Sequence, residues 1–207
     1  MAAMRDEPKL LGDPDAVRAR RALLGEPHVA PLTAYANRLR ITTSAGSGVP
    51  DFDPWDGGIR AQCLFLLEAP GGRAVGSGFV SRNNPDETAK SFWQLNREAA
   101  IPRELTVIWN VVPWYVGAEG RIRAARARDV AMAMQHFEEL LDLLPRLRAV
   151  VLVGRAAQRA ADHVAMLRPQ AKIFHCPHPS PRSLNPRPHL RQEIAECLQG
   201  VAGYLNR

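Results

Sequence analysis

The chain has 207 residues, a mass of 22.8 kDa, a formal net charge of +6 and 46% hydrophobic residues. This length suits a single domain with its own core, and no apolar run approaches the roughly 20 residues of a membrane-spanning helix. The N-terminus also lacks the apolar core of a signal peptide, so we expect a cytoplasmic protein with no membrane partner.

The positive charge suits a polyanionic partner such as nucleic acid. Only three of the 27 basic residues are lysines, however. A high content of arginine and alanine is equally typical of proteins encoded by a genome with a biased base composition. The charge alone therefore leaves both explanations open.

The cysteines are too few and too scattered for a framework of disulfides. Cys63, Cys176 and Cys197 lie far apart in the chain, and no pair has the spacing of metal ligands. An odd count also argues against a disulfide framework.

The N-terminal part is predicted to be helical and then irregular. Asp13-Pro14 is typical of an N-cap followed by proline in the first turn, while a stretch rich in Gly, Ser, Thr, Pro and Asp is typical of a loop. The expected elements are helices over 14–24 and 31–40 and a loop over 41–58. We expect residues 1–50 to be a helical extension packed on a domain formed by residues 51–207.

The rest of the chain alternates short apolar runs with helical patterns. Such alternation predicts a three-layer α/β/α domain with a central parallel sheet of about four strands. Right-handed crossovers place the carboxyl ends of these strands along one edge. The strands are expected at 60–67, 105–110, 149–153 and 171–175, and the helices at 84–100, 121–144, 154–167 and 188–204.

Three of the predicted strands end in segments that could carry chemistry. Glu68-Ala69-Pro70-Gly71 and a glycine-rich loop up to Phe79 follow the first strand, Asn110 ends the second, and His178-Pro179-Ser180-Pro181 follows the last. Open parallel sheets bind ligands at the carboxyl ends of their strands. We therefore expect the three segments to converge on one pocket.

The glycine-rich loop fits neither common phosphate-binding signature. Gly71 to Gly76 has Walker spacing, but Ser77 stands where the lysine is required. Ser81 stands where a dinucleotide fingerprint needs its third glycine. We expect these glycines, Gly71 among them, to let backbone amides approach a base or a phosphate closely.

Two further segments allow more than one interpretation. Asp51 to Trp55 either lies near the site or holds an aromatic residue that pins a long loop. The basic tract from Arg121 to Arg128 either contacts phosphate or forms a solvated helix face.

The three strand-end segments, in this order, resemble the uracil-DNA glycosylase superfamily over roughly Asp51 to Asn185. The most similar branch has Glu-Ala-Pro-Gly as its first motif and His-Pro-Ser as its last. The resemblance implies a monomeric DNA glycosylase. It would flip uracil, or another deaminated base, out of DNA and hydrolyse its N-glycosidic bond, which starts base-excision repair. Such hydrolysis needs no cofactor.

That branch often carries an iron–sulfur cluster held by four cysteines. Three cysteines cannot supply four thiolate ligands, so we expect neither a cluster nor another metal. The rival interpretation is a metal site at His178 with the nearby His175 and His189, but their spacing matches no standard zinc pattern.

The resemblance also implies roles for single residues. Phe79 would stack on the extruded base. Asn110 would recognise uracil, because its amide can accept from N3–H while donating to O4. His178 would donate a hydrogen bond to O2 of the departing base, where negative charge develops. Without the resemblance, Phe79 is a core residue and Asn110 ties down a loop.

The segment around His178 would contact DNA. Ser180 would brace the loop or contact a phosphate, and Arg182 would hold a phosphate. Leu184 would wedge into the space that the flipped base leaves.

Position 69 departs from the superfamily pattern. Members with the strongest uracil activity carry an aspartate where this chain has Ala69, and alanine cannot activate water. The adjacent Glu68 is the candidate acid–base residue, although its side chain could point away. The alternative function is a weak or inactive member that binds nucleic acid or a nucleotide. An unrelated α/β hydrolase or nucleotide-binding enzyme is a third possibility, disfavoured by the missing lysine and glycine.

Overall fold

The structure is a computed structural model that describes residues 5–43, 48–117 and 123–207. Its centre is a sheet of four strands, all parallel, in the order β4-β2-β5-β6. The prediction of a central parallel sheet of about four strands is therefore confirmed. The strands are β2 (Cys63–Leu67), β4 (Thr106–Asn110), β5 (Ala149–Val153) and β6 (Lys172–Cys176).

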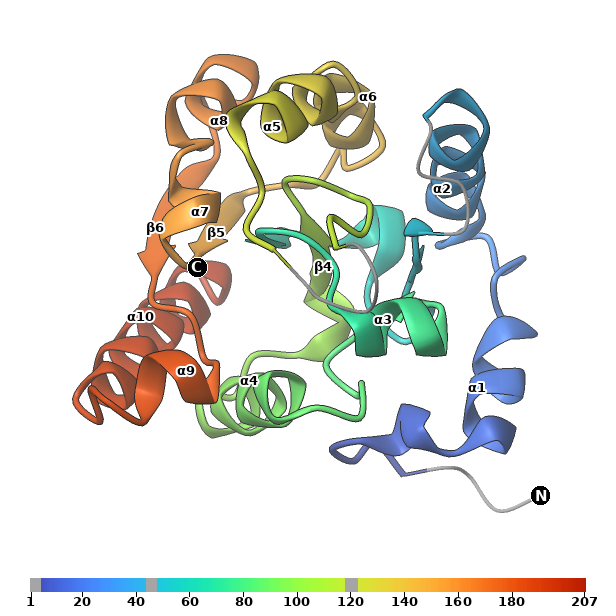
Figure 1. Ribbon diagram of the computed structural model, residues 1–207. Coiled ribbons are helices and arrows are strands. Elements are labelled where there is room, and N and C mark those ends of the chain that lie inside the picture. The colour runs from blue at the N-terminus through green and yellow to red at the C-terminus, as the bar shows by residue number, and fades with distance from the viewer. Residues whose placement is uncertain (1–4, 44–47, 118–122) are drawn as a thin grey trace.

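Helices cover both faces of the sheet and complete the three layers (Figure 1). One layer contains α4 (Glu87–Glu98), α9 (Pro181–Leu184) and α10 (Leu190–Leu205). The other contains α2 (Ala30–Thr42), α5 (Ala127–Met134), α6 (Phe137–Asp142), α7 (Arg155–Gln158) and α8 (Ala161–Leu167). Among the described residues, none of these helices has the length and hydropathy required to cross a bilayer.

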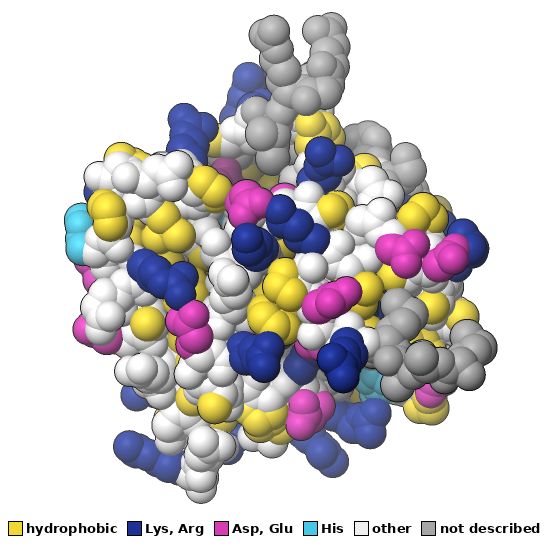
Figure 2. Space-filling model, turned by 90° about the horizontal axis from the view of Figure 1, so that it is seen from below, with side chains coloured by type: hydrophobic (Ala, Val, Ile, Leu, Met, Phe, Trp, Pro, Cys, Tyr) yellow, Lys and Arg dark blue, Asp and Glu magenta, His cyan; other side chains and the backbone are white. Residues whose placement is uncertain are grey.

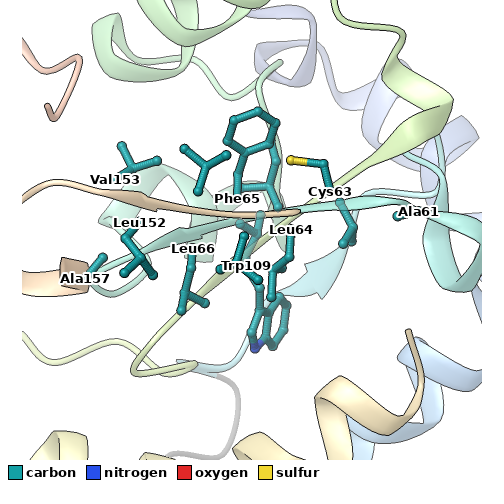
Figure 3. Close-up of a cluster of buried hydrophobic side chains, with 14 of the residues drawn as sticks. Ala61, Cys63, Leu64, Phe65, Leu66, Trp109, Leu152, Val153 and Ala157 are labelled. Carbon is teal, nitrogen blue, oxygen red and sulfur yellow. The ribbon is translucent and has the colours of Figure 1, made fainter. Parts of the chain in front are cut away.

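The core sits on both faces of β2, where successive side chains alternate (Figure 3). Phe65 packs edge-on against Phe92 of α4, with ring centroids 5.0 Å apart. On the opposite face, Trp109 of β4 stacks on Phe52, with ring centroids 3.6 Å apart. The strands are continuous apolar runs because both faces are buried, as expected for a parallel sheet between helices.

Smaller elements lie around the sheet. A second, two-stranded parallel sheet pairs β1 (Asp51–Phe52) with β3 (Phe79–Val80). β1 lies in the stretch 41–58 that was predicted to be a loop, and β3 lies at the end of the glycine-rich loop. The glycine-rich loop also contains a helix, α3 (Gly72–Ser77), which ends at Gly78 with φ +83°. The remaining elements are α1 (Pro14–Arg21) and the 3-10 helices η1 (Leu10–Gly12), η3 (Gly58–Arg60) and η4 (Arg103–Leu105).

Several predicted helix boundaries are wrong. The helix expected over 154–167 is two helices, α7 and α8. The helix expected over 121–144 is two helices, α5 and α6, separated at Gln135 and His136. The helix expected from Asn84 begins instead after Asp86, whose carboxylate accepts from the Ala89 N–H at 2.9 Å. Asn84 cannot cap the helix because its side chain bonds Ser77 Oγ and the Phe79 carbonyl.

The segment around Asp53 is a structural anchor and does not line the pocket described below. The Asp53 carboxylate is buried and accepts hydrogen bonds from Arg20, Arg103 and Ser81. Burial alone would raise the pKa of Asp53, but Arg103 and Arg20 lower it to about 2. The Arg20 guanidinium lies 3.5 Å from the centroid of the Trp55 ring. Of the two interpretations of residues 51–55, the pinned loop is therefore correct.

Candidate functional site

A pocket of about 570 Å³ opens at the carboxyl ends of the strands. This volume is within the range of sites that bind small molecules or nucleobases. The three strand-end segments converge on it, as the sequence pattern predicted. Of the candidate residues, the pocket is lined by Glu68, Gly71, Asn110, His178, Ser180 and Arg182.

Asn110 is the last residue of β4 and is only 3% exposed. Its side-chain nitrogen Nδ2 is buried and has no hydrogen-bond partner among the described residues. A buried donor without a partner costs about 1–3 kcal/mol, and such groups are often completed by a ligand. Asn110 therefore has an unused hydrogen-bonding capacity at the wall of the pocket.

His178 lies two residues beyond the end of β6, between Pro177 and Pro179. Burial lowers the pKa of the imidazole, and the nearby carboxylates of Glu68 and Asp86 oppose this shift. Burial therefore favours the neutral form of the ring. A neutral imidazole still has one N–H to donate.

Gly154, directly after β5, allows His178 to take this position. Gly154 has φ +84°, and a Cβ built on it would lie 3.1 Å from Cβ and 3.2 Å from Cδ2 of His178. The Gly154 N–H also donates to the Cys176 carbonyl at 2.8 Å. This hydrogen bond ties the end of β5 to the start of the segment that contains His178. Because His178 lies so close, only glycine fits at position 154.

We expect Gly154→Ala to displace the imidazole by a few tenths of an ångström and to lower activity by about tenfold, since small misplacements of catalytic groups are costly. Gly154 has φ +84° and ψ 158°, a conformation essentially restricted to glycine, so alanine there should also destabilise the protein by roughly 1–3 kcal/mol. A single-turnover assay of activity, compared with thermal unfolding, measures both effects.

Gly76→Ala is the matched control. Gly76 lies in α3, and a Cβ there would meet nothing within 4 Å. If Gly154→Ala retains the parent rate, the close approach to His178 has no functional role.

Glu68 extends from the end of β2 into the lining of the pocket. Its Oε1 accepts a hydrogen bond from the backbone N–H of Ala125 at 2.7 Å. Ala69, the next residue, also lines the pocket but offers no polar group. Glu68 therefore links the wall of the pocket to the segment before α5.

The structure differs from expectation at Phe79, whose side chain is fully buried and does not line the pocket. The residue pairs with Asp51 in the β1–β3 sheet, and its ring lies in the interior. Stacking on a ligand would require this sheet to open. The apolar wall of the pocket consists instead of Val80, Phe92 and Ile108.

Gly71 borders the pocket at the start of α3. A Cβ at Gly71 or Gly72 would meet nothing within 4 Å. Packing within the protein therefore does not require glycine at these positions, and free space remains beside the pocket.

After His178, Ser180 and Arg182 line the pocket, whereas Leu184 packs against the core. Ser180 lines the pocket, and its hydroxyl oxygen lies 3.1 Å from that of Ser183. Arg182 lines the pocket with an exposed side chain. Leu184 is half-buried against the core and outside the pocket lining, so a wedge role would require it to leave that contact.

Several lining residues were not anticipated as site residues. Ser81, Arg82, Asn84 and Asp86 form one wall, and Arg123 contributes from the basic tract. Position 84 was expected only as the start of a helix, and nothing local in the sequence marks the others. Arg123 is paired with Asp129 at 2.6 Å, so this member of the tract is not a free solvated residue. Arg121 lies outside the described residues.

Within the described part of the chain, no group of three or more His, Cys, Asp or Glu residues is arranged to hold a metal ion. His175 and His189 are exposed. The three cysteines are free. The rival metal site at the histidines therefore has no support from their positions.

A family model described as the uracil DNA glycosylase superfamily matches residues 54–202. No curated protein matches the chain significantly. Among solved structures, the chain is similar to the solution NMR structure of a candidate uracil DNA glycosylase from Methanosarcina acetivorans, with 15% identity and a TM-score of 0.48. That match covers 68% of this chain and 91% of the other.

Proposed function

This chain belongs to the uracil DNA glycosylase superfamily, and we propose that it removes uracil from DNA by hydrolysing the N-glycosidic bond. The observation that best supports this activity is the convergence of Glu68, Asn110 and His178 on one pocket. These residues come from three separate strand ends, so their convergence follows from the fold and not from proximity in the sequence.

In the proposed reaction, a flipped uracil enters the pocket and is read by Asn110. The side-chain oxygen accepts from uracil N3–H, and Nδ2, which has no partner among the described residues, donates to O4. Cytosine presents the opposite donor and acceptor pattern at these two atoms. The buried amide therefore selects uracil, since an unmatched polar group in the pocket is costly.

His178 acts on the departing base. As the bond between the base and the sugar breaks, negative charge develops on uracil O2, and a neutral imidazole N–H stabilises it. Burial favours the neutral ring by lowering its pKa. Val80, Phe92 and Ile108 offer an apolar surface to the base ring.

DNA phosphates would be held at the mouth of the pocket by Arg73 and Arg182, both exposed. On the face of the molecule seen in Figure 2, Lys and Arg side chains are interspersed with Asp and Glu. Among the described residues of that face, the basic side chains are therefore spread out and form no single broad patch.

We expect DNA binding to weaken steeply with salt, because each phosphate contact releases counterions. Arg182→Ala should reduce the slope of log K against log salt by about 1. Arg187→Ala is the control, since Arg187 is exposed in the same segment but does not line the pocket. Fluorescence anisotropy over a salt series measures these slopes. Affinity independent of salt would indicate a small-molecule ligand.

Ala69 favours a second candidate function, a member that binds DNA or a nucleotide without cleaving it. One assay separates the two. The protein is incubated with a uracil-containing oligonucleotide, and abasic sites are detected by strand cleavage in alkali. Abasic sites support the glycosylase. A gel shift without abasic sites supports the binding protein.

A further inference from the structure

We propose that Asp86 is the carboxylate that orients and deprotonates the attacking water, in place of the side chain that position 69 lacks. The inference rests on the proposed glycosylase function. Asp86 lines the same pocket as His178 and Asn110. Its charge also reaches His178, where it opposes the effect of burial on the pKa of the imidazole.

Two carboxylates line the pocket, and their surroundings differ. Glu68 has a long side chain whose hydrogen bond goes to the backbone of Ala125, in the segment before α5. Asp86 has a short side chain at the start of the 12-residue helix α4. Short side chains on regular elements hold catalytic geometry better than long ones tied to loops.

The backbone of Asp86 is well anchored. Its N–H donates to the Asn84 carbonyl at 2.8 Å, and the Asn84 side chain is itself held by Ser77 and Phe79. Oδ1 of Asp86 accepts from the Ala89 N–H at 2.9 Å. Oδ2 makes no hydrogen bond to any described residue, and a water molecule can occupy that side of the carboxylate.

Several charged groups lie around Asp86. The start of α4 presents the positive end of the helix dipole, which favours a negative charge there. The other charged or titratable groups that line the pocket are Glu68, Arg73, Arg82, Arg123, His178 and Arg182. Of the four arginines, Arg123 is paired with Asp129 at 2.6 Å and Arg82 lies 3.7 Å from Asp56, whereas Arg73 and Arg182 are exposed.

The proposed step is balanced as follows. The water oxygen forms a bond to C1′ of the sugar, and its proton passes to Asp86 and then to solvent. The bond between C1′ and the base nitrogen breaks, and its electron pair leaves with the base. The departing anion is stabilised by His178, while the negative charge of Asp86 stabilises the positive charge that develops on the sugar.

The test compares Asp86→Asn and Asp86→Ser with Glu68→Gln. Asparagine and serine cap a helix about as well as aspartate, so both Asp86 variants should retain the parent melting temperature. Glutamine keeps an acceptor for the Ala125 N–H. Single-turnover excision from a uracil-containing oligonucleotide is measured from acid to neutral pH, and DNA affinity is measured in parallel.

We expect both Asp86 variants to lose at least about 100-fold in excision rate, the scale of general base catalysis, with unchanged DNA affinity. The parent's rate should fall toward acid pH, where the carboxylate takes up a proton. This fall, the acid limb of the pH profile, should be absent in both Asp86 variants. Glu68→Gln tests the other carboxylate of the pocket, and whatever its effect on the rate, the dependence on acid pH should persist in this variant.

The outcomes separate the inference from the function on which it rests. If the parent protein makes no abasic sites, the proposed function fails. If the parent is active and the Asp86 variants keep its rate and pH profile, only the role of Asp86 is overturned. Loss of the acid limb in Glu68→Gln instead would assign the water to Glu68.

Discussion

Replacing His178 with alanine is expected to lower single-turnover uracil excision by about 100- to 1000-fold, the usual loss when one donor to a developing anion is removed. The donor acts mainly in the transition state, because the charge on uracil O2 appears only as the bond breaks. DNA affinity should therefore hardly change. Rapid-quench measurement of abasic sites, with anisotropy for binding, tests both statements.

His175→Ala is the matched control for this experiment. His175 lies on β6, three residues before His178, with an exposed side chain. Its loss should leave the excision rate within about twofold, as is usual for exposed residues away from a site. If His178→Ala excises uracil at the parent rate, the imidazole is only a loop residue and the proposed mechanism is wrong.

The position of the site at one edge of the sheet could be predicted from the sequence because its determinants are local. Short apolar runs such as Ala149–Val153 define a buried strand, and residues such as Asn110 mark where one ends. Parallel strands then require the carboxyl ends to share an edge. Nothing beyond these two rules was needed to bring Asn110, Glu68 and His178 together.

The contribution of Ser81 and Arg82 to the wall could not be predicted, because it depends on contacts between distant parts of the chain. Asp53 receives hydrogen bonds from Arg20 and Arg103, which lie 33 and 50 positions away. The same carboxylate binds the Ser81 hydroxyl. Local sequence patterns carry no information on which buried charges will meet. The contacts that hold this wall could therefore be identified only from the structure.

Phe79 illustrates a second limit of prediction from local sequence patterns. The resemblance implied that Phe79 faces the ligand, whereas without it Phe79 was expected in the core, and the residue lies in β3, paired with β1, with its side chain buried. A two-residue strand has no periodic signal, since periodicity needs at least four residues to be recognised. Phe92 of α4, by contrast, belongs to both the core and the lining of the pocket.

Replacing Asn110 with aspartate is expected to exchange one hydrogen-bonding pattern for another. An ionised carboxylate only accepts hydrogen bonds. It can still accept from uracil N3–H, but it faces the lone pairs of O4 without a donor. The unpartnered Nδ2 at this position is the atom that would be lost. Uracil excision should fall by roughly 1–3 kcal/mol in transition-state free energy, the scale of one mismatched base contact.

Cytosine offers an amino group at C4, from which the aspartate can accept. Its N3 then needs a proton shared with the acid, which becomes available as the pH falls, so Asn110→Asp should acquire weak cytosine excision under acidic conditions. Asn110→Ala, the control, should lose uracil excision without acquiring cytosine excision, because it has no polar group. Oligonucleotides with a single uracil or cytosine, assayed across pH, distinguish the two variants. If both excise uracil at the parent's rate, Asn110 is a structural residue, and base recognition must come from another part of the pocket.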